Sequence, residues 1–393
     1  MSDDEKLEIL LERFFNRFNS INTKTLQMLG ETVKLFDGIS PSEAHILAQK
    51  LKYGTDLDDL LRELSKASGK SIQDVQIMLD KVAEENVAFS EVYYKAKKKK
   101  YVPYKNNIQL KRYVKGIANE TNSLFKNIAK SKNIGFTFKN AKGKVIFKPL
   151  AEVYNDLIDE AVYNVSTGTT DFYSAMRNTL KRLADSGVKV HEDKVGYESG
   201  YNRRIDSSVR MNVLSAVRQI NINVQKQVGR EFSADGVEVS AHSPCAEDHL
   251  FINGRQFSNK QFERINNSLV RPVGELNCRH YVFSIVLGVN KPNYTDEELN
   301  QMEQESLKKI EYEGKKYTKY EATQVQRRLE TMVRKQKDRQ IIAKASGDKK
   351  EILNAQQKIT QLTHKYNDFS KKVGLKTYKE RLTISGYKRT RVK

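Results

Sequence analysis

The residues of this chain best suited to chemistry are its cysteines and histidines, and most of them share one stretch. Both cysteines and three of the six histidines lie in residues 242–280 of the 393-residue chain. Thiolate sulfur and imidazole nitrogen are the donors of tetrahedral zinc sites, and two spaced groups of such residues let a loop close on one ion. We therefore expect a zinc-binding centre here. The candidate ligands are His242, Cys245, His249, Cys278 and His280.

Two other interpretations of this stretch stay open. Its spacings match no standard zinc finger, so the cysteines can instead be reduced, buried apolar residues and the histidines structural. Alternatively the cluster belongs to a metal-dependent enzyme, with Glu247 or Asp248 as general base to a metal-bound water. A Cys278 nucleophile paired with His280 or His249 is a further enzymatic alternative.

Two predicted strands position the candidate ligands. Residues 237–240 (Val-Glu-Val-Ser) alternate apolar and polar side chains, as a strand does, and His242 follows directly. Residues 281–286 form a second apolar run with the composition of a strand, which leaves Cys278 and His280 at its beginning. The ligands thus lie where two strands enter and leave one loop.

Most of the remaining chain shows apolar residues at helical spacing. The first helix covers about the first 28 residues and ends before Gly38, and residues 40–43 (Ser-Pro-Ser-Glu) form a capping box for the next. Further helices are expected at about 56–67, from residue 71, and at 108–130, 150–165, 171–185, 200–229, 318–345 and 348–371, with hairpins at 136–147 and 311–318.

These elements predict a predominantly helical α+β protein. An acidic helical domain covers residues 1–92, and a basic linker, helix and β-hairpin cover 93–148. A central helical domain with the small strand-containing His/Cys module covers 149–313. A basic helical hairpin and tail cover 314–393, and the tail from residue 386 is expected to be disordered in isolation.

Composition argues for a protein made in a reducing compartment and against a membrane protein. Two cysteines in a chain of this length do not form a disulfide scaffold. The chain has no run approaching the ~20 apolar residues of a membrane span. Its N-terminus, Met-Ser-Asp-Asp-Glu, lacks the basic-then-apolar order of a secretory signal.

The net charge of +20 is distributed in alternating blocks. Residues 95–148 carry 16 Lys and Arg against one acidic residue, and residues 314–393 carry 23 against seven. Residues 1–94 and 149–313 each carry more acidic than basic residues. Such blocks suit a protein that joins a polyanion, with DNA the obvious one, to other protein surfaces. Arg203, Arg204 and Asp206 are expected to form ion pairs at the surface, with a polar cluster facing a site as the alternative.

Lysines alternate with tyrosines in residues 93–104. Such a segment could grip phosphates and stack on bases, although an exposed linker would look the same and Pro103 favours the linker. The candidate polyanion contacts, here and in the tail, are Lys95, Lys97, Lys98, Lys99, Lys100, Lys388, Arg389 and Arg391.

The order of segments resembles the phage minor capsid protein 2 family, which also occurs in prophages. The resemblance covers about residues 20–385 and is specific because several motifs occur together. These are residues 161–172 (Ala-Val-Tyr-Asn-Val-Ser-Thr-Gly-Thr-Thr-Asp-Phe), 201–204 (Tyr-Asn-Arg-Arg), 207–210 (Ser-Ser-Val-Arg), 240–242 (Ser-Ala-His), 253–255 (Asn-Gly-Arg), 277–280 (Asn-Cys-Arg-His) and 312–317 (Tyr-Glu-Gly-Lys-Lys-Tyr).

The resemblance implies a structural virion protein rather than an enzyme. Its members look like head proteins of the portal vertex, related to the Mu F-type head morphogenesis group, so the expected partners are portal and other capsid proteins, with non-specific DNA contact. The expected location is the virion, after synthesis in a bacterial cytoplasm, and the oligomeric state stays open. The family pattern is matched by His242, His249, Cys278 and His280, with Cys245 as a substitute ligand.

Overall fold

The computed structural model describes residues 3–96, 98–140, 142–169, 171–192, 201–275 and 278–390. Within these ranges most residues are helical and the strands form small antiparallel sheets, which confirms the predominantly helical α+β class. No described helix is long and apolar enough to cross a membrane. The chain divides into two compact units. Unit 1 comprises residues 1–71, 124–210 and 326–393, and unit 2 comprises residues 72–123 and 211–325.

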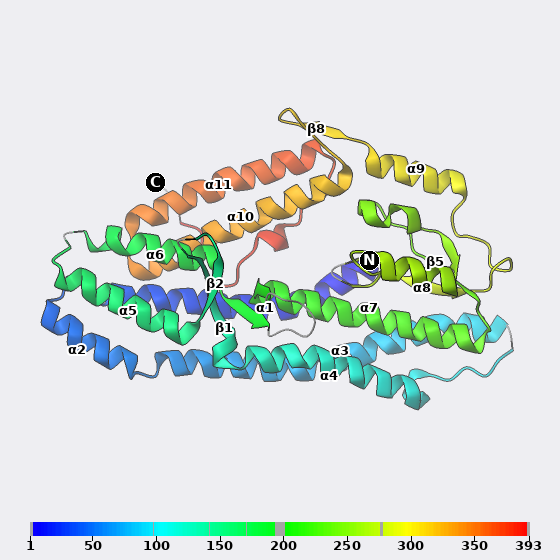
Figure 1. The fold of residues 1–393 in the computed structure, drawn as a ribbon, viewed down its shortest axis with the longest axis horizontal. Coiled ribbons are helices and arrows are strands. Elements are labelled where there is room, and N and C mark those ends of the chain that lie inside the picture. The colour runs from blue at the N-terminus through cyan, green and yellow to red at the C-terminus, as the bar shows by residue number, and fades with distance from the viewer. Residues whose placement is uncertain are drawn as a thin grey trace. The chain divides into compact units, whose positions relative to one another are not determined.

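Unit 1 is built mainly from helices around an aromatic core. The Phe125 ring stacks on Phe18 at 5.7 Å and on Phe14 at 6.3 Å between centroids. Helix α2 packs against α5. The unit contains α1 (Asp3–Lys34), α2 (Pro41–Lys52), α5 (Leu150–Ser166), α6 (Phe172–Ser186), α11 (Lys349–Lys372) and parts of α3 (Asp56–Ala96), α4 (Ile108–Ile128), α7 (Ile205–Glu231) and α10 (Lys319–Ser346). Figure 1 labels these helices.

Helix α2 begins at the capping residue that the sequence indicates, whereas α3 runs through a predicted break. Ser40 accepts a hydrogen bond from the Glu43 backbone, and the Glu43 carboxylate accepts one from the Ser40 backbone at 2.8 Å, which confirms the predicted capping box. The predicted break between 67 and 71 is wrong, because α3 continues through it. Leu64, Ser68 and Ser71 are buried and continue one stripe, and a glycine inside a helix costs only about 1 kcal/mol.

A four-stranded sheet of order β2-β1-β3-β4 completes unit 1. Its first hairpin confirms the predicted one. A Cβ on Gly135 would lie 1.9 Å from the Lys148 carbonyl oxygen, so close pairing of the strands requires glycine there. The helix expected from residue 200 begins later, because residues 201–204 pair with β3. The strands are β1 (Ile134–Lys139), β2 (Val145–Pro149), β3 (Lys189–Glu192) and β4 (Tyr201–Arg204).

A charged cluster lies inside unit 1, where surface ion pairs were expected. Arg204 donates to Asp338 at 2.9 Å and lies 3.5 Å from Asp206, and both carboxylates are fully buried. Arg334, which is partly buried, lies 3.6 Å from Asp206. The expectation of surface pairs is therefore wrong for Arg204 and Asp206. The cluster, named here the buried ion cluster, consists of Arg204, Asp206, Arg334 and Asp338.

The predicted C-terminal helical hairpin is present in unit 1. Helices α10 and α11 lie side by side and antiparallel, with Gly347 at φ 88° in the turn and Asp348 capping α11 at the Glu351 backbone. Between the helices, hydrogen bonds join Gln326 to Ser370, Tyr366 to Glu330 and Gln340 to Gln356.

The segment after α11 packs onto unit 1. The Asn19 side chain accepts a hydrogen bond from the Ser385 backbone, and Thr23 donates to the Ser385 carbonyl oxygen, both at 2.7 Å. The Thr390 backbone donates to Gln356 at 3.2 Å. The expectation of disorder is therefore wrong for residues 386–390, and residues 391–393 lie outside the described residues.

Unit 2 contains a helical part formed by residues 72–96, 108–123 and 211–231. Tyr94 donates to Glu231 and Tyr104 donates to Asp80, and burial together with these carboxylates raises the pKa of both phenols. The Tyr101 ring packs edge-on against Tyr94 at 5.6 Å. Tyr94 and Tyr104 are buried, so these two rings are not exposed for base stacking.

The rest of unit 2 is the small module that carries the candidate ligands. Its three-stranded sheet has the order β6-β5-β7. The module core contains Val237, Ile252, Val273, Cys278 and Val282. The elements are β5 (Gly236–Val239), η3 (Glu247–Ile252), β6 (Gln256–Ser258), α8 (Asn259–Ser268) and β7 (Val282–Ile285), followed by α9 (Asp296–Leu307), β8 (Ile310–Tyr312) and β9 (Lys315–Tyr317).

Candidate metal centre

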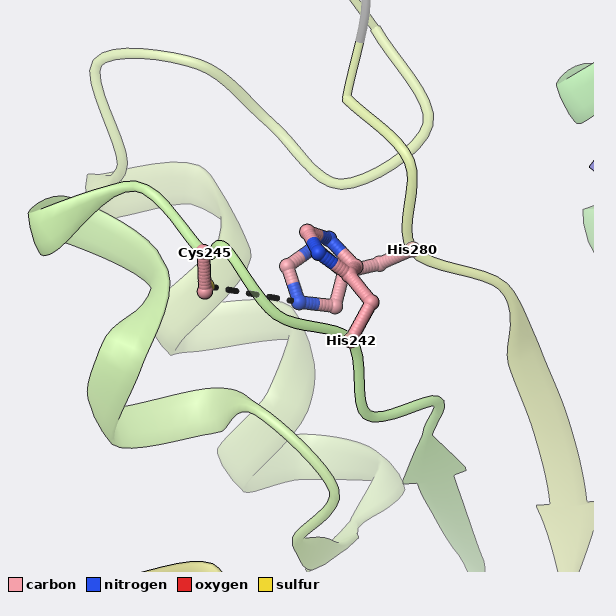
Figure 2. A group of neighbouring side chains, drawn as sticks. All are labelled: His242, Cys245 and His280. Atoms are coloured by element: carbon pink, nitrogen blue, oxygen red, sulfur yellow. Dashed lines mark hydrogen bonds between the residues drawn. The ribbon is translucent and has the colours of Figure 1, made fainter. Parts of the chain in front are cut away.

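All five candidate ligands lie in the small module of unit 2. His242 follows β5, His280 precedes β7, and the antiparallel pairing of these strands brings the two rings to 4.2 Å between centroids, as Figure 2 shows. His249 lies on the short helix η3. The structure therefore brings the sequence-predicted cluster together, while residues 276 and 277 lie outside the described residues.

The ligand atoms form two groups that share His280. In each group all atoms lie within 4.8 Å of one another. The first group is His249, Cys278 and His280, named here the Nδ1 group, and the second is His242, Cys245 and His280, named here the Nε2 group. The labels follow the His280 nitrogen that faces each group: Nδ1 lies 3.4 Å from the Cys278 sulfur, and Nε2 lies 3.7 Å from the Cys245 sulfur.

Hydrogen bonds to carbonyl oxygens decide which nitrogens carry protons. His249 Nε2 lies 2.7 Å from the Arg271 carbonyl oxygen, which can only accept, so Nε2 carries the proton and Nδ1 keeps its lone pair. Asn253 Oδ1 accepts the His242 backbone N–H at 2.9 Å, which identifies it as the amide oxygen. His280 Nε2, 3.1 Å from the same oxygen, is therefore also a donor. Both rings present the Nδ1 lone pair to the Nδ1 group.

The donor distances in the Nδ1 group match the edges of a zinc tetrahedron. Zinc bonds of about 2.05 Å to nitrogen and 2.3 Å to sulfur at tetrahedral angles separate two nitrogens by about 3.3 Å and nitrogen from sulfur by about 3.6 Å. The two Nδ1 atoms of His249 and His280 lie 3.3 Å apart. The Cys278 sulfur lies 3.7 Å from His249 Nδ1 and 3.4 Å from His280 Nδ1. This group fits a metal ion.

The electrostatics favour the ligand forms of Cys278 and His280, whereas the pKa of His249 is raised because its hydrogen bonds outweigh its burial. Burial alone would raise the pKa of Cys278, but the neighbouring His249 and hydrogen bonds from the Gly274 and His280 backbones outweigh it and lower that pKa. Burial and the neighbouring His242 and His249 lower the pKa of His280 to about 2, so its ring is neutral at pH 7. The site thus holds a thiolate-prone sulfur beside a neutral imidazole, as metal binding requires.

The Nε2 group is less suited to a metal. To bind through Nε2, His280 would have to lose the hydrogen bond to Asn253. The Cys245 sulfur donates to the Ala246 carbonyl oxygen at 3.5 Å, and burial raises the pKa of this thiol to about 12. His242 Nδ1 lies 3.2 Å from the Pro244 carbonyl oxygen. Of the four family-matched ligands, His242 therefore lies in a different group from His249 and Cys278.

The residues that orient the ligands were not predicted. Arg271 supplies the carbonyl oxygen for His249 while its guanidinium binds Asp248, with the shorter contact at 2.5 Å, and Tyr320 at 3.0 Å. Asn253 lies in the Asn-Gly-Arg motif of residues 253–255. The motif drew attention to this segment but did not indicate that Asn253 orients a histidine. Nothing in the sequence around Arg271 indicates its position beside the site.

Asp248 and Glu247, the candidate general bases of the enzymatic alternative, lie outside the Nδ1 group. Asp248 is paired with Arg271 and lies 4.0 Å from His249 Nε2, the nitrogen that faces away from the Nδ1 group. Glu247 is exposed. Among the residues that the structure describes, neither carboxylate belongs to the Nδ1 group or to the Nε2 group.

The candidate polyanion contacts are mostly exposed. Lys95 pairs with Glu91 at 3.0 Å, and Lys99 bonds the Glu231 carbonyl oxygen and lies 4.9 Å from the Phe232 ring. The other exposed candidates are Lys98, Lys100, Lys388 and Arg389. Lys97 and Arg391 lie outside the described residues.

Fold and site together define a predominantly helical α+β protein that carries a His/Cys module able to hold a metal ion. Within this class, the sequence profile described as phage minor capsid protein 2 matches residues 3–371. The chain belongs to the phage minor capsid protein 2 family, which confirms the resemblance found in its motifs. Membership supports a structural role in a phage head and a virion location. No curated protein and no solved structure matches the chain.

Proposed function

We propose that this protein is a minor structural component of a phage or prophage head that acts at the portal vertex, without catalytic turnover. The observation that carries the proposal is the family match over residues 3–371. The division of charge supports it: the acidic residues 1–94 suit protein partners such as the portal, and the basic segments suit a polyanion.

The vertex assignment predicts where the protein lies in purified heads. Asymmetric cryo-electron microscopy of heads carrying a tagged copy should show the tag at a single vertex, beside the portal. Heads made without the protein should lose that density and no other. A tag distributed over every vertex or over the shell would contradict the proposal.

Contact with packaged DNA forms the second part of the proposal. Lys98, Lys100, Lys388 and Arg389 are exposed and lie in strongly basic stretches. Contacts of lysine and arginine with phosphates release counterions, so affinity falls with salt at a slope of about −0.9 per phosphate contact on duplex DNA. The expected binding is weak, salt-sensitive and independent of sequence.

Alanine at these four positions should therefore make the salt slope of DNA binding shallower by up to about 0.9 for each phosphate that is no longer neutralised. Fluorescence anisotropy with a duplex, repeated over a series of salt concentrations, measures this slope. A matched control replaces four exposed lysines of the acidic helical segment, Lys34, Lys50, Lys66 and Lys70. Equal effects of the two variants would show that only net charge matters and would overturn the assignment of these residues to DNA binding.

We further infer that the metal is zinc and that the Nδ1 group holds it. One thiolate and two imidazoles are ligands that zinc prefers, and the donor spacings support this choice. Bound zinc would supply a crosslink between the loop on η3 and the segment that enters β7. Asn253 and Arg271 would orient the two histidines, since metal-bound imidazoles usually donate their second N–H to a fixed acceptor.

A further inference from the structure

The Nδ1 group offers three ligands, whereas a tetrahedral metal takes four. Among the described residues, no further His, Cys, Asp or Glu ligand atom lies within 4.8 Å of all three donors of this group together. Zinc sites that are purely structural are usually closed by four protein ligands. The fourth position of this centre therefore needs an occupant.

The second cysteine sulfur of the module, that of Cys245, faces the opposite nitrogen of the His280 ring. The Cys245 sulfur lies 3.7 Å from His280 Nε2, whereas the Nδ1 group uses Nδ1 of the same imidazole. The lone-pair directions of the two ring nitrogens diverge, so a metal on Nδ1 has the ring between itself and Cys245. Figure 2 shows Cys245 and the His280 nitrogen joined on that side.

The other neighbouring side chains are held by different partners. His242 lies against the His280 ring at 4.2 Å and a 43° tilt, and its Nδ1 faces the Pro244 carbonyl oxygen. Asp248 binds the Arg271 guanidinium through both carboxylate oxygens. Neither residue has a ligand atom within 4.8 Å of all three donors of the Nδ1 group.

We propose that a metal at this centre keeps its fourth position for an exchangeable non-protein ligand. In the isolated protein this ligand is water, and a small monodentate anion replaces it. The inference rests on the proposed metal site and goes beyond it, because a structural zinc closed by protein would have no such position. It makes the centre able to bind a donor group from outside the chain.

Cobalt(II) and azide test the inference in the full-length protein. Cobalt replaces zinc, its visible absorption reports its ligands, and the cobalt content of the same sample is measured. With a free position, azide should shift the visible bands in a saturable titration, and zinc X-ray absorption should show one sulfur and three nitrogen or oxygen ligands. The Cys245→Ser variant should give the same spectrum and the same azide response as the unaltered protein.

The outcomes separate the two proposals. Bound cobalt with no response to azide, or two sulfur ligands, would overturn the open position while leaving the metal site intact. An azide response that appears only after Cys245→Ser would identify Cys245 as the fourth ligand and overturn the inference equally. Failure to bind cobalt or zinc would overturn the metal site, and the inference with it.

Discussion

Replacing Cys278 by serine is expected to abolish stoichiometric zinc binding and to destabilise unit 2. Cys278 is the sulfur donor of the Nδ1 group and is buried in the module core. Binding free energy at a site that exists only in the folded state is folding free energy, and structural zinc in small domains supplies on the order of 10 kcal/mol. Elemental mass spectrometry should fall from about one zinc per chain to a background value.

The matched control is Cys245→Ser, which removes the other buried thiol of the same module. Cys245 belongs to the Nε2 group, so this variant should keep its zinc. A metal content lost in Cys245→Ser but kept in Cys278→Ser would reverse the assignment of the ligand group. Equal loss in both would indicate that the two cysteines bind one ion together.

A chelator extends the same test to stability. Treatment of the unaltered protein should lower its melting temperature, whereas Cys278→Ser, already without metal, should not respond. Asn253→Ala should fall between them, because removing a residue that orients a ligand typically weakens metal affinity about 10- to 100-fold. A chelator that leaves the unaltered protein unchanged would contradict a stabilising metal.

Local rules predicted most of the elements and the composition of the site. The capping box at Ser40 is present, with the Glu43 carboxylate 2.8 Å from the Ser40 backbone nitrogen, because both partners lie within one helical turn. The strands on either side of the His/Cys loop follow from alternation in the first and from an apolar run in the second. Cys278 and His280 come just before one of these strands, whereas His249 lies on η3 in the loop between them.

What the sequence did not reveal depends on contacts between distant residues. Asn253 and Arg271 orient the histidines through single hydrogen bonds that no local pattern encodes. Strand β4 reads as the beginning of a helix until its partner β3 is known. The division of five candidate ligands into two groups depends on which face of His280 each one meets, and spacing alone does not give this.

The buried ion cluster of unit 1 gives the second large expected effect. Arg204 and Asp338 are 134 residues apart in sequence and form an ion pair at 2.9 Å in the interior. Asp338→Asn keeps the shape of the side chain but leaves Arg204 without one of its two carboxylates. Removing one partner of a buried pair typically costs about 3–5 kcal/mol, because the remaining charge stays desolvated. Urea unfolding should show this loss.

A surface ion pair in the same unit supplies the control. Lys24 and Glu63 lie 2.6 Å apart with side chains about half exposed, so Glu63→Gln should cost only about 0–1 kcal/mol. The double variant Arg204→Met/Asp338→Leu should lose much less stability than the two single changes together, since no unpaired charge remains from that pair. Additive losses would contradict electrostatic coupling and would leave packing as the cause.

The same cluster should make unit 1 sensitive to acid. Burial alone would raise the pKa of Asp206, but Arg204 and Arg334 outweigh it and hold that pKa below its ordinary value of 3.8. A carboxyl with a depressed folded-state pKa contributes stability above the unfolded value and loses it as the pH falls through the folded value. Asp206→Asn should therefore flatten the acid limb of the stability curve, while Glu63→Gln should leave that limb nearly unchanged. A curve that keeps its full slope in Asp206→Asn would exclude Asp206 as the group responsible.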